Sequence, residues 1–175
     1  HLEPGEYKTS GFWGYGGDGC YPWDGCGSWD FPTEGDDQFP SESFPITIFH
    51  SNISIKGSGF EGSNVSKIIG DGYSSSVLHI AHVDYLQNVS TISDLVITNG
   101  YGNYERAGGV SIVLGSAKIE NVLIHDNYGI NGGGISFLAM EDWYSPRLYL
   151  NNVTISDNSA SDFGGGLFIN SKHNP

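Results

Sequence analysis

Short apolar runs separated by polar residues recur along most of the chain. From Pro45 onward each run is β-branched, and Gly, Asn, Ser or Asp bounds it on either side. Period-two alternation with turn residues between the runs is typical of strands. The runs are Ile46–Phe49, Ile53–Ile55, Lys67–Ile69, Val77–Ile80 and Val89–Ile92. They predict an all-β fold.

A longer pattern repeats in the C-terminal half. The phrase at residues 94–100 is echoed at 121–127 and again at 152–158, and each copy is followed by a glycine run and another strand. One such unit cannot bury its apolar face alone, but units stacked about 4.8 Å apart give each strand a parallel partner on either side. The repeat therefore predicts a coiled solenoid of strands with apolar columns inside it. The residues expected in these columns are Val122, Ile124, Val153 and Ile155.

The glycine and asparagine positions of the repeat are expected at the corners of the coil. Glycine accepts the positive φ angles of sharp turns, and asparagine side chains can stack their amides from one coil to the next. The predicted corner and ladder residues are Gly109, Gly134, Gly166, Asn99, Asn127 and Asn158.

The glycine phrases resemble the repeats of bacterial autotransporter and polymorphic outer-membrane proteins. They stand here as Gly132–Ile135 and Gly164–Leu167, with a weaker copy at Gly108–Val110. Near the N-terminus, Leu2–Tyr7 and Ile68–Gly72 are similar to the first coils of secreted pectate-lyase-like proteins. The resemblance implies a right-handed parallel β-helix. It implies no single function, because β-helices host lyases, glycosidases, adhesins and structural fibres.

The resemblance covers residues 1–10 and about 46–175 of one predicted domain, residues 1–175. At about 25 residues per coil, we expect about five or six coils. Residues 46–175 are expected to form these coils, and residues 11–45 an insertion or cap. Since the chain begins at His1 without Met and stops without a closing element, we also expect it to be an excerpt of a longer or processed protein.

Residues 11–45 differ in character, because their aromatic side chains are spaced by Gly, Asp and Pro without a helical or alternating period. Long loops inside a compact domain are often functional. Cys20 and Cys26 could close a small disulfide loop, or they could be free thiols or half of a metal site. The aromatic side chains could pack on the solenoid, contact another subunit, or stack on sugar rings. They include Trp13, Tyr15, Tyr21, Trp23 and Trp29.

The net charge limits the kinds of partner that the protein can bind. The chain has 20 acidic and 7 basic side chains, so its net charge is -13. Nucleic-acid binding needs a basic footprint and is excluded. No run of about 18 apolar residues is present, so no membrane span is predicted. Acidity, the cysteine pair and four glycosylation sequons together favour an extracellular or cell-surface location. The sequons begin at Asn52, Asn64, Asn88 and Asn152.

Asp126 and Asp157 form the first candidate site. They occupy equivalent positions in successive repeats, where Asn99 stands in the preceding one. In adjacent coils their carboxylates would lie about 5 Å apart, a spacing that suits a retaining glycosidase. The alternative is that they are turn residues that bond nearby main-chain N–H groups. Periodicity favours the turn, because catalytic residues are normally unique.

Two further groups of residues are candidate sites. His79 and His82 with Asp84 could hold a metal or perform acid–base chemistry, but positions i and i+3 of a strand face opposite sides, which favours scattered surface residues. Lyases with this fold use Arg or Lys with Ca²⁺. The only arginines of this chain are Arg106 and Arg147, both in loops and without an arginine cluster around them, which argues against a lyase.

A Ca²⁺ site in the acidic, Gly-rich part of the chain is a further candidate. Oxygen-rich, Gly-rich loops can bind Ca²⁺, but the sequence shows neither a helix–loop–helix calcium loop nor a nonapeptide repeat. We therefore predict no cofactor and no metal ligands, and keep Ca²⁺ as an open alternative. The acidic residues concerned are Asp18, Asp24, Asp30, Asp36 and Asp37.

These observations favour a structural or adhesive protein, a segment of a surface fibre, wall or adhesin. It would assemble by lateral or end-to-end contacts with itself or with other surface proteins, and glycans are a further candidate partner. The alternatives are a carbohydrate-active enzyme, either a polysaccharide lyase or a glycosidase, and a non-catalytic carbohydrate-binding module.

Overall fold

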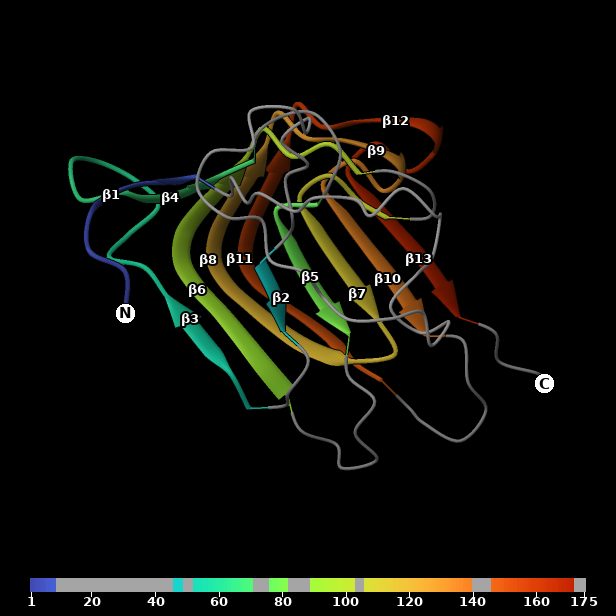
Figure 1. The fold of residues 1–175 in the computed structure, drawn as a ribbon, viewed down its shortest axis with the longest axis horizontal. Coiled ribbons are helices and arrows are strands. Elements are labelled where there is room, and N and C mark those ends of the chain that lie inside the picture. The colour runs from blue at the N-terminus through green and yellow to red at the C-terminus, as the bar shows by residue number, and fades with distance from the viewer. Residues whose placement is uncertain are drawn as a thin grey trace, which may run out of the picture.

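A computed structural model of the chain shows a parallel β-solenoid (Figure 1). It describes residues 1–8, 46–48, 52–70, 76–81, 89–102, 106–139 and 146–171. Within these ranges there are thirteen strands and no helix. The prediction of an all-β solenoid is confirmed.

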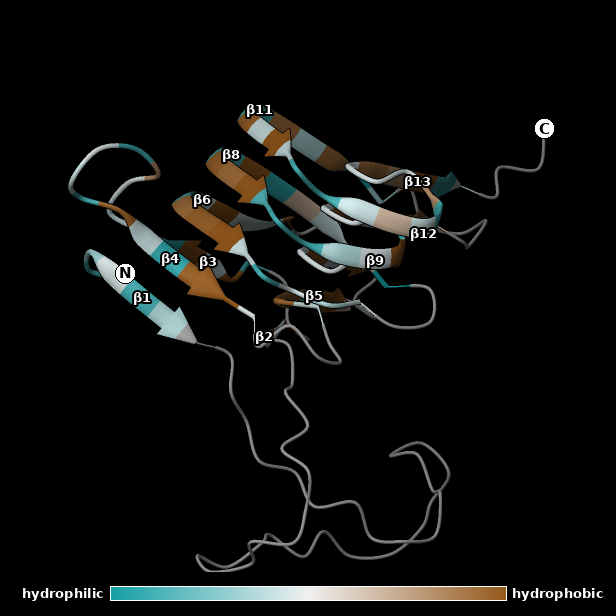
Figure 2. Ribbon diagram, turned by 90° about the horizontal axis from the view of Figure 1, so that it is seen from above, coloured by the Kyte–Doolittle hydropathy of each residue, from teal (hydrophilic) through white to brown (hydrophobic). Residues whose placement is uncertain are grey.

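The strands form three sheets in which every pair is parallel. Sheet A contains β1 (Gly5–Lys8), β3 (Ser54–Lys56), β4 (Ser66–Ile69), β6 (Val89–Thr98), β8 (Ser116–His125) and β11 (Leu148–Ser156). Sheet B contains β2 (Ile46–Ile48), β5 (Leu78–Ala81), β7 (Val110–Val113), β10 (Ile135–Ala139) and β13 (Leu167–Ser171). Sheet C contains β9 (Tyr128–Asn131) and β12 (Ser159–Phe163). In the two C-terminal repeats the chain passes from sheet A through sheet C to sheet B. Figure 2 shows the strands of successive coils lying side by side.

The solenoid has about 3 turns, so the expectation of five or six coils is wrong. The three repeats form the turns that contain β6–β7, β8–β10 and β11–β13. The N-terminal strands add only parts of a turn. Strands β3 and β4 both lie beside β6, at Thr91–Ser93 and at Val96–Thr98. The expected number of coils came from dividing the chain length by the length of one coil. That division counted these partial turns as complete coils.

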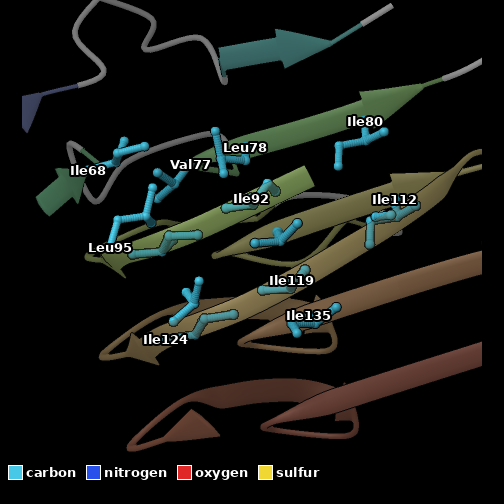
Figure 3. Packing of buried hydrophobic residues seen from close by; sticks show 14 of the residues in the cluster. Ile68, Val77, Leu78, Ile80, Ile92, Leu95, Ile112, Ile119, Ile124 and Ile135 are labelled. Atoms are coloured by element: carbon cyan, nitrogen blue, oxygen red, sulfur yellow. The ribbon is translucent and has the colours of Figure 1, made fainter. Parts of the chain in front are cut away.

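The register of the strands builds the apolar columns inside the solenoid. In sheet A, Leu95 aligns with Val122 and Val153, and Ile97 aligns with Ile124 and Ile155. In sheet B, Leu78, Val110, Ile135 and Leu167 form one column, and Ile80, Ile112, Phe137 and Ile169 form another. Figure 3 shows labelled members of these columns in the core cluster. The four residues predicted inside the solenoid belong to the core cluster or pack against it.

Glycine is needed where successive coils approach at the entry to sheet B. A Cβ atom on Gly109 would lie 2.4 Å from the Gly134 carbonyl oxygen, and one on Gly134 would lie 2.6 Å from that of Gly166. These glycines therefore serve close stacking. The positive φ angles in this part of the coil fall instead on Gly132 (74°) and Gly164 (62°).

Candidate functional site

The turn that follows each long strand of sheet A carries most of the polar side chains singled out in the sequence. We call it the A–C corner and define it as residues 99–102, 126–128 and 157–159. At its first position Asn99, Asp126 and Asp157 have φ angles of 59°, 52° and 52°. Asn and Asp enter this left-handed region more readily than other non-glycine residues. The residue type at this position thus follows from the turn.

Asp126 and Asp157 lie in adjacent coils, because Ser156 aligns with His125 immediately before them. Neighbouring strands lie about 4.8 Å apart, so the spacing predicted for a carboxylate pair is available. Both side chains are exposed, and Asp126 Oδ2 lies 2.6 Å from His125 Nδ1. Glycosidase acids are generally kept protonated by an apolar, desolvated setting, and neither carboxyl has one. The arrangement fits turn residues better than a catalytic pair.

Asn127 and Asn158 form a side-chain ladder at the A–C corner. Asn158 Oδ1 accepts hydrogen bonds from the main-chain N–H (3.0 Å) and the Nδ2 (2.9 Å) of Asn127. Asn127 Oδ1 accepts one from the Gly100 N–H, at 2.9 Å. Asn127 is only 2% exposed, and its hydrogen bonds offset the cost of burying an amide. Asn99 lies outside this ladder, at the position of Asp126, and its Nδ2 donates to the Gly70 carbonyl (2.8 Å).

A second ladder, which the sequence reasoning missed, crosses the middle of sheet A. Asn152 Nδ2 donates to Asn121 Oδ1, and Asn121 Nδ2 donates to Asp94 Oδ1, both at 2.9 Å. The φ angles are 57° for Asp94, 52° for Asn121 and 50° for Asn152. These residues head the three copies of the repeat, so their shared position was a signal that could have found them. Asn152 is therefore part of this ladder as well as the first residue of a glycosylation sequon.

Two tyrosines stack beside the A–C corner, and these too were missed. The rings of Tyr101 and Tyr128 have centroids 4.8 Å apart and planes inclined by 22°. Tyr101 is 39% exposed. Both follow the Gly100/Asn127 position of the repeat directly, which places them in neighbouring coils. The pair places an aromatic surface at the A–C corner.

Among the described strands, the coil of β11 to β13 has no neighbouring layer on one side. Each of these strands ends its sheet in the described part of the chain. Leu150 is 40% exposed although its partner in register, Ile119, is fully buried. In β13, Ile169 is 56% exposed, against 6% for Phe137 beside it. Phe163 is also exposed and stacks on Phe168, with ring centroids 6.2 Å apart.

His79 is buried, so the expectation of a surface histidine is wrong. It lies in β5 between Leu78 and Ile80, and sheet B and the residues over it leave only 7% of it exposed. Burial first, and then the charge of Arg106, lower the pKa of His79 to about 4, although a hydrogen bond with the Ser111 main chain opposes this. Burial also lowers the pKa of Arg106. A buried histidine next to a cation is therefore neutral at pH 7.

The remaining predicted residues divide into exposed ones and ones outside the described ranges. The sequon residues Asn52, Asn64 and Asn152 are exposed. Outside the described residues lie Asn88, His82, Asp84, Cys20, Cys26, the five aromatic residues Trp13, Tyr15, Tyr21, Trp23 and Trp29, and the acidic residues considered for Ca²⁺.

The described residues contain no group of three His, Cys, Asp or Glu side chains that could hold a metal ion. They also contain no helix with the length and hydropathy needed to cross a bilayer. No family model matches the chain, and neither the curated proteins nor the solved structures compared with it give a match.

Proposed function

We propose that this protein is a structural or adhesive segment of an extracellular fibre, wall or adhesin, in which the open C-terminal coil stacks on a further layer of strands. We take its coil to be right-handed and akin to the pectate-lyase-like and autotransporter β-helices. A second copy of the chain is the proposed stacking partner, with another surface protein as the alternative. The observation that carries the proposal is the exposure of Leu150 in β11 and Ile169 in β13, whose partners in register one coil earlier, Ile119 and Phe137, are buried.

The strand edges support this proposal. β11 is nine residues long and pairs only with β8 among the described strands. An exposed edge of this length presents unpaired main-chain groups that template the addition of another strand. A solenoid layer without a neighbour needs a polar cap, a further coil or another subunit for the same reason.

The asparagine ladders would help to select which strand layer stacks on that edge. Asn158 Oδ1 accepts from Asn127, whereas Asn158 Nδ2 donates back to the Ile124 carbonyl at 2.8 Å, so the amide-to-amide ladder ends at Asn158 among the described residues. Asn152 stands in the same terminal position in the ladder of sheet A. A stacked strand layer with amide or main-chain groups opposite Asn158 and Asn152 would extend both ladders.

The net charge sets the conditions for assembly. Two copies with a net charge of -13 repel each other. Salt screens this repulsion, with a Debye length of about 10 Å at 0.1 M ionic strength. Apolar edge contacts keep their strength in salt, so association should increase as NaCl is added.

Sedimentation velocity over a range of protein concentrations tests the proposal. We expect concentration-dependent association in the wild type and its loss in a Phe163→Ser, Ile169→Thr double variant. Tyr101→Ser is the matched control, because it removes an exposed aromatic side chain away from the open coil. A wild type that stays monomeric at high concentration and in salt, and binds no surface partner, contradicts the proposal.

The stacked Tyr101–Tyr128 pair favours carbohydrate recognition at the A–C corner as a second candidate. Exposed aromatic rings beside polar groups suit the faces of sugars, and Asp126 and His125 could bind hydroxyl groups. Binding to a glycan panel that is lost in Tyr101→Ala would support a binding module. Release of reducing ends that is abolished in both Asp126→Asn and Asp157→Asn would identify a glycosidase. Binding unaffected by Tyr101→Ala rules out the tyrosine pair as the sugar surface.

A further inference from the structure

The inward and outward positions of β11 are symmetric about the junction between Asn151 and Asn152. Asn152 has a φ of 50°, and the register between β11 and β8 skips it, so the alternation starts again after it. The outward residues Tyr149 and Thr154 lie at equal distances from the junction along the chain. The inward residues, which pack on the core cluster or lie in register with it, are Leu148 and Leu150 before the junction and Val153 and Ile155 after it.

This symmetry allows β11 to pair with the β11 strand of a second copy. A twofold axis through the junction makes the two strands antiparallel. Leu150 of each copy then lies opposite Val153 of the other, and Leu148 lies opposite Ile155. Inward positions meet inward positions, so the apolar columns of sheet A continue from one copy into the other. A register shifted by one residue would place inward positions opposite outward ones.

β11 also lacks the features that protect edge strands. It ends the row of β6, β8 and β11 in Figure 2. Natural edge strands are kept short or carry charged side chains, but the nine residues of β11 include no charged one, whereas β8 contains Lys118 and Glu120. The opposite edge of sheet A has short strands, β1 with four residues that include Glu6 and Lys8, and β3 with three residues. A second β11 therefore matches this strand in length and polarity better than the opposite edge does.

The charges at the two ends of β11 fit the same pairing. Arg147 immediately precedes the strand and Asp157 immediately follows it, and both are exposed. Neither forms an ion pair within the described residues. The antiparallel register places Arg147 opposite Ser156 of the second copy, with Asp157 next in the chain. Opposite charges would thus meet at both ends of the strand pair.

We propose that the last coil, β11 to β13, is a self-complementary surface through which two copies form a closed dimer with a twofold axis at the Asn151–Asn152 junction. The inference rests on the proposed stacking of this coil on a second copy and specifies its geometry. A twofold contact uses the same patch on both copies and ends with two chains, whereas a head-to-tail stack continues as a filament. A fibre of this protein would then contain such dimers, joined through other surfaces.

Two charge-reversal variants of the whole chain test the pairing, Arg147→Glu and Asp157→Lys. In a homodimer of either variant, like charges meet at both ends of the strand pair. Each variant alone should dimerise about tenfold more weakly than the wild type, because two exposed ion pairs become repulsive contacts. In an equal mixture, the introduced glutamate faces the introduced lysine, and the unchanged Asp157 and Arg147 face each other. The mixture should therefore regain the wild-type affinity.

Sedimentation velocity at one ionic strength measures these affinities and the size of the complex. Lys67→Glu is the matched control, because it makes the same change in net charge as Arg147→Glu at an exposed residue of β4, outside the last coil. It should dimerise like the wild type. Wild-type species larger than two chains, a mixture no better than either variant alone, or an equal loss in Lys67→Glu would overturn the twofold pairing and leave the stacking itself in place. A wild type that stays monomeric would overturn both.

Discussion

The middle and last coils carry the same repeat but differ in what surrounds it. Ile119 and Ile124 of the middle coil are fully buried, whereas Leu150 in register with Ile119 is 40% exposed. Asn127 is buried and Asn158 only partly so. The apolar residues are present in both coils, so burial here depends on having a neighbouring coil on each side. This is the behaviour of a one-dimensional repeat, whose stability is a sum of contacts between neighbours.

The largest expected effect comes from shortening an aligned pair of apolar side chains. Ile119→Ala should lower the free energy of unfolding by about 3 to 4 kcal/mol, because it opens a cavity in a filled column. Leu150→Ala should cost less than about 1 kcal/mol, because its side chain is already partly hydrated. Urea unfolding of the two variants measures both values. Equal losses would show that the last coil is as well packed as the middle one.

Acid should also destabilise the protein through His79. Its folded pKa of about 4 lies below the ordinary value of 6.5. The unfolded chain therefore binds a proton first as the pH falls, and stability that is complete above pH 6.5 is lost down to about pH 4. The loss amounts to about 3 kcal/mol. Unfolding curves between pH 7 and 4 should show this loss in the wild type.

Two histidine variants isolate the cause of the acid effect. His79→Gln should remove the pH-dependent component, while His125→Gln, which changes the partly exposed histidine of the A–C corner, should retain it. The comparison tests whether a side chain buried under a covering segment affects stability in the same way as a side chain buried between neighbouring coils. An unchanged acid profile in His79→Gln would mean that another group causes the loss.

The ladder asparagines should show a smaller difference in stability between the middle coil and the last coil. Asn127→Ala removes a buried amide and leaves the Gly100 N–H without its acceptor, so we expect a loss of about 2 kcal/mol. Asn158→Ala should cost about 1 kcal/mol, because the amide that it removes is only partly buried and water can take its place beside the Asn127 donors. Thermal unfolding of both variants measures the two losses. A larger loss for Asn158→Ala would contradict the expectation that the middle coil contributes more stability than the last one.

The sequence predicted those features that depend on neighbours along the chain. The repeat at residues 94–100, 121–127 and 152–158 was sufficient for the solenoid and its inward columns, because period-two alternation fixes which side chains face the core. The Asn127–Asn158 contact followed from their equivalent positions. The ladder headed by Asp94 was overlooked because it falls inside long strands rather than between them.

Features set by contacts between distant residues were not predictable in the same way. His79 was expected at the surface because nothing near it in the chain indicates that Ala107 folds over sheet B. The number of turns was overestimated because β3 and β4 share one partner strand, β6. Both errors concern which segment lies beside which, and alternation along a strand carries no information about that.

Hydrogen exchange measured at low and high protein concentration tests the central claim, that the last coil is an open layer that stacks. The account predicts that amides of β11 and β13 exchange fast in dilute protein and gain protection as the concentration rises. Amides of β8 and β10 should be protected throughout. Protection of β11 and β13 equal to that of β8 and β10 in dilute protein, or no change with concentration, would contradict it.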